Sequence, residues 1–161
     1  MRAVIMSDSH GDIYRLRMTI EGVWQQVGRV DAYIHLGDGA LDFQDLESTL
    51  LGRDPQAALY QVRGNCDWSV SDVPARQLIW LDDLKVLICH GHHYNVKSGL
   101  YELDEAADAN GCALALYGHT HEPAMDFRRA MLVNPGSAHD GNIALLETVP
   151  GQLPKVRLLH F

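Results

Sequence analysis

Histidines and acidic residues that can bind metal ions recur where short apolar runs of the sequence end. Two imidazoles lie two residues apart in Gly118-His119-Thr120-His121, directly after the apolar run 112–117. Imidazole is a common ligand of transition-metal ions, and two such side chains at one strand end can reach the same site. Taken alone, the motif fits a turn with two surface histidines equally well, so its meaning depends on the other segments.

Four earlier apolar runs are followed by donors of the same kind. These donors are Asp8 with His10, Asp38, Asn65 and His90. A glycine lies beside nearly every one of them, and glycine lets the backbone turn sharply and approach a ligand closely. In open α/β sheets, binding sites form outside the carboxyl ends of the strands. We therefore expect these donors to meet at one edge of the fold.

The composition of this donor set predicts the number of bound ions. Two carboxylates, one amide and four imidazoles are too many for one tetrahedral zinc ion, which takes about four ligands. The set fits two divalent ions about 3.5–4 Å apart, with one carboxylate bridging them. Mixed oxygen and nitrogen donors favour Mn²⁺, with Ni²⁺, Zn²⁺ and Fe²⁺ as alternatives, over Ca²⁺.

Apolar runs separated by turn residues predict the elements that must position these donors. The expected strands lie at 3–6, 32–36, 57–62, 77–81, 85–88, 112–117, 130–133, 143–146 and 156–159. The helical spacing of apolar residues predicts helices at 13–27, 43–51 and 98–109. Strands and helices alternate at first, and strands dominate later. This order indicates an α/β layered domain whose sheets pack against each other.

Composition and charge argue against some classes of protein. The 161 residues are enough for one domain with a real core, and we expect a single domain over 1–161. A net charge of −8 argues against nucleic-acid binding, which needs a basic face. No apolar run approaches the roughly 20 residues of a membrane span. Three cysteines without a Cys-x-x-Cys pair fit reduced thiols, so we expect a cytoplasmic protein.

The chain resembles the calcineurin-like metallophosphoesterase superfamily in the order and content of five motifs. They are Asp8-x-His10, Gly37-Asp38, Gly64-Asn65-Cys66-Asp67, His90-Gly91-His92 and Gly118-His119-Thr120-His121. The short chain, and Cys66 where larger members usually have histidine, point to the compact branch with YfcE/MJ0936-type phosphodiesterases and the Vps29 scaffold. The resemblance covers residues 8 to about 137. It implies a sandwich of two mixed β-sheets with helices on the outer faces (αββα).

This resemblance implies that two ions share one carboxylate. The ligands of one ion would be Asp8, His10 and His121. Those of the other ion would be Asn65, His90 and His119. Asp38 would bridge the two ions. The neighbouring imidazoles of His119 and His121 would thus serve different ions, with Thr120 as the spacer between them.

The resemblance also implies hydrolysis of a small phosphodiester substrate by a hydroxide that bridges the two ions. Asn65, Cys66 and His92 would contact the substrate, with Asn65 and His92 as catalytic residues. In larger relatives of the family that the chain resembles, a histidine at the position of Cys66 would act as the general acid that protonates the leaving group. A thiol is a poor substitute in this role. We therefore expect aryl diesters to be cleaved faster than alkyl monoesters. His92 either supplies the missing proton or orients the site through a hydrogen bond.

Two alternatives use the same motifs. A Vps29-like interaction scaffold would keep the fold with a vestigial or structural metal site, but every implied ligand is present, which favours an enzyme. Nucleophilic attack by Cys66 is disfavoured because its motif supplies neither a general base nor an anion cradle. Trp68 and Tyr94 lie beside the motifs, where they either line the site or pack elsewhere. The oligomeric state is left open, including a homo-oligomer.

Overall fold

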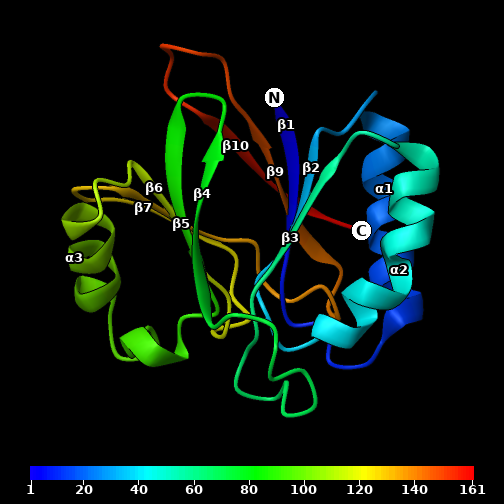
Figure 1. Ribbon diagram of the computed structural model, residues 1–161, viewed down its shortest axis with the longest axis horizontal. Helices are drawn as coiled ribbons and strands as arrows, with labels where there is room; N and C mark the ends of the chain where they lie inside the picture. The colour runs from blue at the N-terminus through cyan, green and yellow to red at the C-terminus, as the bar shows by residue number, and fades with distance from the viewer.

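Ten strands form two sheets in the computed structural model, which describes residues 1–161 (Figure 1). The strands are β1 (Arg2–Met6), β2 (Ala32–His35), β3 (Ala58–Gln61), β4 (Arg76–Leu81), β5 (Leu84–Cys89), β6 (Leu114–Leu116), β7 (Ala124–Phe127), β8 (Met131–Asn134), β9 (Asn142–Glu147) and β10 (Lys155–His160). The first sheet has the order β10-β9-β1-β2-β3, and the second has the order β4-β5-β6-β8-β7. Both sheets mix parallel and antiparallel pairs.

Three helices cover the outer faces of the two sheets. Helices α1 (Ile13–Gln26) and α2 (Ala40–Arg53) pack on the first sheet, and α3 (Tyr101–Ala109) packs on the second. A short 3-10 helix, η1 (His92–Tyr94), follows β5. The arrangement confirms the predicted sandwich of two mixed sheets with outer helices. None of the helices combines the length and apolar character that crossing a membrane requires.

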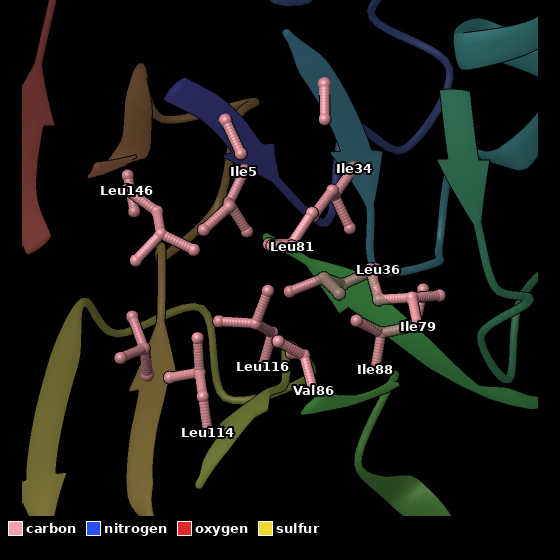
Figure 2. Close-up of a cluster of buried hydrophobic side chains, with 14 of the residues drawn as sticks. Ile5, Ile34, Leu36, Ile79, Leu81, Val86, Ile88, Leu114, Leu116 and Leu146 are labelled. Carbon is pink, nitrogen blue, oxygen red and sulfur yellow. The ribbon is translucent and has the colours of Figure 1, made fainter. Parts of the chain in front are cut away.

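Branched aliphatic side chains from both sheets fill the space between them (Figure 2). Ile5 and Ile34 project from the first sheet, and Ile88 and Leu116 from the second, into one cluster of 15 buried residues. Burying each large aliphatic side chain contributes about 1.5–3 kcal/mol. The core therefore anchors the same strands whose carboxyl ends carry the donor residues.

The predicted elements are present, with boundaries that differ by a few residues. The third helix begins at Tyr101 and not at Ser98. One strand, β7, was not predicted. Its sequence Ala-Met-Asp-Phe mixes apolar and acidic residues, and it pairs only with β8 at the edge of the second sheet. An exposed edge strand needs no continuous apolar run, so the pattern of buried strands does not reveal it.

The carboxyl ends of β1, β2, β3, β5 and β6 lie at the same end of the sandwich, the lower end in Figure 1. The loop after β3, residues 62–75, also lies at this end. Residues that are distant in the sequence therefore become neighbours. His10 and His121, for example, are 111 positions apart and have contacting rings.

Candidate metal centre

Two clusters of side chains that could hold a metal ion lie at this end of the sandwich. The first cluster comprises Asp8, His10 and His121. The second cluster comprises Asp38, His90 and His119. Within each cluster, one donor atom from every residue lies within 4.8 Å of the others. His119 and His121 thus lie in different clusters, the same division that the sequence resemblance implies for the ligands.

The first cluster is centred on the buried carboxylate of Asp8. Its Oδ1 lies 3.2 Å from His121 Nε2 and 3.8 Å from His10 Nε2. The two imidazole nitrogens lie 3.1 Å from each other. The other oxygen, Oδ2, accepts a hydrogen bond from the backbone N–H of His119 at 3.1 Å. One oxygen therefore holds the carboxylate in place, while the other faces the two imidazoles.

Asp38 and His90 are the buried members of the second cluster. His90 donates a 2.8 Å hydrogen bond from Nδ1 to the carbonyl oxygen of Leu36, so its Nε2 faces Asp38 Oδ2 at 3.3 Å. Asp38 Oδ1 accepts a 2.7 Å hydrogen bond from the backbone N–H of Cys66. A backbone carbonyl that accepts from one ring nitrogen fixes the tautomer and orientation of a metal-binding imidazole.

Asp38 also belongs to a third group of donors, with His10 and Cys66. Its carboxylate therefore lies near donors of both clusters. Asn65 and Cys66 are exposed in the loop after β3, and Asn65 Nδ2 lies 3.3 Å from Cys66 Sγ. Of the seven predicted ligands, six fall into the two clusters, and Asn65 lies beside them in this loop.

Left-handed backbone conformations are concentrated at the predicted ligands. Their φ values are 57° at Asp8, 49° at His10, 53° at Asp38, 70° at His119 and 64° at His121. Only two other non-glycine residues have positive φ, Asp82 and Asn95. Each such residue costs about 1–2 kcal/mol, and the cost is found where the surrounding structure enforces a functional geometry.

Two glycines allow the strand-end loops to approach each other. A Cβ atom at Gly118 would overlap the side chains of Ser7 and Asp8, and a Cβ atom at Gly64 would overlap Asp38. The Gly118 N–H donates to the carbonyl oxygen of His90 at 2.9 Å, which ties the loop after β6 to the end of β5. Close backbone approach explains why glycine lies beside the donors.

Two acidic residues outside the clusters hold the donor loops. Both carboxylate oxygens of Asp67 accept backbone N–H bonds, and the donors are Asp38, Gly39, Ala40 and Gly64. Helix α2 has no side-chain cap of its own, so Asp67 also caps its N-terminus. Asp42 accepts from Ser9 Oγ and from the Gly11 N–H, which fixes the loop around His10. Sequence reasoning did not single out Asp42, although it lies four residues after Asp38.

The donor set fits divalent cations. Asp8 Oδ1 and His90 Nε2 are buried, lie 3.9 Å apart and have no hydrogen-bond partner. An unsatisfied buried polar group costs about 1–3 kcal/mol. A cation between the side chains would satisfy both atoms. Nitrogen and oxygen ligands lie about 2.0–2.2 Å from a zinc-like ion, which matches the spacing of about 3 Å between neighbouring donor atoms.

Burial and mutual contact set the protonation of His90, His119 and Asp38 in the second cluster and of the neighbouring His92. Burial, with a contribution from neighbouring histidines, lowers the pKa of His92 and of His119 to about 4. Burial also opposes charge on His90, but Asp38 and Asp8 raise its pKa overall. For Asp38 burial acts to raise the pKa, and the interaction with His90 lowers it below its usual range. At neutral pH His92 and His119 therefore present unprotonated nitrogens, the form in which imidazole binds metals.

The residues predicted to contact substrate line two openings beside the clusters. Asn65 and His92 line a cavity of 360 Å³, together with Trp68. Cys66 lines a separate depression of 260 Å³. Burial and the nearby Asp38 raise the pKa of the Cys66 thiol, which keeps it protonated and argues against the alternative in which it is the nucleophile. Tyr94 lies elsewhere, and its hydroxyl accepts a hydrogen bond from Arg76.

In a comparison with protein families, residues 1–149 match the calcineurin-like phosphoesterase superfamily domain. The chain is 30% identical over 138 residues to the probable metallophosphoesterase YsnB of Bacillus subtilis, covering 85% of this chain and 75% of that protein. It is also 30% identical over 161 residues to the phosphodiesterase MJ0936 of Methanocaldococcus jannaschii, covering 84% and 83% of the two chains.

Solved structures with the same architecture include a predicted phosphoesterase and vacuolar protein sorting 29. A predicted phosphoesterase of Streptococcus pneumoniae is 28% identical, with a TM-score of 0.70 over 98% of this chain and 97% of that one. Vacuolar protein sorting 29 of Cryptosporidium parvum superposes with a TM-score of 0.73 over 99% and 97% of the chains, at 13% identity. At that identity the likeness shows the fold alone.

Proposed function

The chain belongs to the calcineurin-like phosphoesterase superfamily, and we propose that it is a two-metal-dependent phosphodiesterase acting on small phosphodiesters. One observation carries the proposal. Asp38 belongs to donor groups with residues of both clusters, and the buried atoms Asp8 Oδ1 and His90 Nε2 form no hydrogen bond within the protein. A cation held between these side chains would satisfy both atoms, each of which otherwise costs about 1–3 kcal/mol.

In this proposal the two ions are Mn²⁺, and the clusters hold one each. Asp8, His10 and His121 hold the first ion. Asn65, His90 and His119 hold the second ion. Asp38 is shared. When bound, the ions supply charge neutralisation of the phosphate and lower the pKa of water toward 7, so that a nucleophile is available at neutral pH.

The remaining polar groups at the opening position the substrate. Asn65 and His92 are placed to hydrogen-bond the phosphate oxygens, because both line the cavity beside the clusters. His92 is unprotonated at neutral pH, which suits orientation of the ester better than protonation of its leaving group. Cys66 offers only a thiol, a weak hydrogen-bond donor. Esters with good leaving groups, such as aryl diesters, should therefore react faster than alkyl monoesters.

Metal titration with bis(p-nitrophenyl) phosphate tests the proposal. We expect chelated protein to be inactive, Mn²⁺ to restore hydrolysis, and Asp38→Asn to remove it while the fold is retained by circular dichroism. Unchanged activity in Asp38→Asn would exclude the shared carboxylate and the mechanism with it. Binding of ions without any turnover would favour a Vps29-like scaffold with a structural metal site.

A further inference from the structure

The cavity of 360 Å³ beside the clusters has an unusual wall. Three of its lining residues are Arg63, Trp68 and Ser71, and it shares Asn65 and His92 with the proposed reaction site. A cavity of this size is in the range that accommodates small organic ligands. Any group esterified to a phosphate held at the clusters would have this cavity next to it.

Trp68 provides the cavity with a free aromatic surface. Its side chain is 88% exposed, although tryptophan is normally among the more buried residues of a protein. The one stacked guanidinium in the protein lies on Trp24, so the indole of Trp68 has no such partner. An exposed indole is a surface on which a flat ring can stack.

Arg63 provides a positive charge that no carboxylate neutralises. Its NH1 donates to the backbone carbonyl of Ser71 at 2.6 Å, and it forms no ion pair. The acidic residue of the wall, Asp67, already accepts four backbone N–H bonds with its two oxygens. The cavity therefore combines an aromatic surface with an unpaired cation.

The separate depression that Cys66 lines differs in all these respects. It has a volume of 260 Å³ and is lined in part by Gly11, Leu41 and Asp42, with no arginine, lysine or tryptophan. A phosphodiester has two ester groups, and these two openings offer them opposite surroundings. An asymmetric diester would therefore be bound in one orientation.

We propose that the cavity formed by Arg63 and Trp68 selects phosphodiesters that carry a flat aromatic ester group. This inference rests on the proposed function, because the phosphate must lie at the clusters for its ester group to reach the cavity. The aromatic ring stacks on Trp68. An electron-rich or anionic substituent on that ring faces Arg63.

Calorimetric titration of the Mn²⁺-loaded protein with phenylphosphonate and ethylphosphonate tests the role of Trp68 without requiring turnover. We expect Trp68→Ala to reduce the preference for the phenyl compound by about 10-fold, the size of one aromatic stacking contact. Trp80→Ala is the matched control, because Trp80 is 60% exposed on β4 and lines neither opening. Equal affinity of the wild type for the two compounds, including no binding of either, would overturn the proposal. So would an unchanged preference in Trp68→Ala.

A second titration isolates Arg63. Arg63→Gln keeps a side-chain N–H for the Ser71 carbonyl and removes the charge. We expect it to weaken binding of 4-carboxyphenylphosphonate about 3-fold relative to phenylphosphonate, as for a partly exposed ion pair. An unchanged ratio would remove Arg63 from the proposal. Hydrolysis of diesters is measured separately, so a protein that shows phenyl selectivity but no turnover would contradict the proposed function and not the selectivity.

Discussion

The two donor clusters differ in how firmly the protein holds them. In the second cluster Asp38 and His90 are buried, and each is fixed by a hydrogen bond to the backbone. In the first cluster only Asp8 is buried. The side chains of His10 and His121 are 32% and 43% exposed, and their ring nitrogens contact each other and the Asp8 carboxylate.

This difference has a consequence for metal binding. Ligands that are already fixed lose little conformational freedom when they bind, whereas exposed side chains must be ordered at that moment. The buried second cluster should therefore bind its ion more tightly than the exposed first cluster. Stepwise loading follows, with the buried cluster filled first.

Removal of the buried imidazole should have the largest effect. We expect His90→Ala to lower diester hydrolysis more than about 100-fold, because loss of a direct ligand exceeds the 10–100-fold cost of losing an outer-shell partner. Metal analysis after gel filtration should show loss of the tightly bound ion. His93→Ala is the control, since His93 is an exposed neighbour outside both clusters. Two tightly bound ions in His90→Ala would break the comparison between the clusters.

Asp67 holds the loop that carries Asp38, so its removal should weaken the second cluster from a distance. Asp67→Ala leaves four backbone N–H groups without their carboxylate. We expect the free energy of unfolding to fall by about 1.5–3 kcal/mol, the range for hydrogen bonds to a charged group. The affinity for the tighter ion should fall about 10–100-fold. Urea unfolding and metal titration measure the two effects.

Asp72→Ala is the matched control for this variant, because Asp72 is exposed in the same loop. A loss of stability in Asp67→Ala without any change in metal affinity would limit Asp67 to capping helix α2. An equal weakening of both ions would show that the two clusters are not held independently.

Exchange of an exposed ligand should affect only one ion. We expect His121→Ala to weaken binding of the looser ion, the one at the first cluster, about 10-fold or more and to leave the tighter ion in place. The reason is that His121 contacts Asp8 and His10 but belongs to no group with His90. Calorimetric titration of chelated protein with Mn²⁺ separates the two binding events. Loss of the tighter ion in this variant would reverse the assignment of the clusters.

Some features of the two clusters could be predicted from the sequence, and others could not. The donors were visible because each follows an apolar run, nearly always with a glycine beside it, and the two sheets bring such strand ends together. The division of the ligands between two clusters came from the family resemblance, because spacing alone suggested that His119 and His121 reach the same site. A role of Asp67 in bracing the loop or a histidine could be expected from its place in the motif Gly64-Asn65-Cys66-Asp67, but its partners could not. The contacts of Asp42 were not predictable, because an acidic residue near a helix start usually caps its own helix or faces solvent. Both acidic residues bond to loops tens of residues away.

A fall in pH should weaken the second cluster by protonating His35. This residue lies in β2, shortly before Asp38, and is not itself a predicted ligand. Burial lowers the pKa of this residue to about 4. Among the ionisable groups around it, Asp67 and Asp38 oppose the shift, whereas His90 and His10 add to it. The backbone N–H of Gly37 donates to its Nδ1 at 3.2 Å, which ties the ring to the loop that carries Asp38.

The sign of the effect follows from the pKa in each state. Unfolded His35 takes up a proton near pH 6.5, and folded His35 does so only near pH 4. Its contribution to stability is thus complete above about pH 6.5 and is lost as the pH falls toward 4. Between about pH 7.5 and pH 5.5 the loss is about 1 kcal/mol. His35→Asn keeps an acceptor for Gly37 but does not titrate, so its stability should fall by that much less over the same interval. Urea unfolding of both chelated proteins makes the comparison, in which the titrations of the ligand histidines cancel. If the free energies of unfolding of the two proteins changed equally with pH, protonation of His35 would not weaken the second cluster.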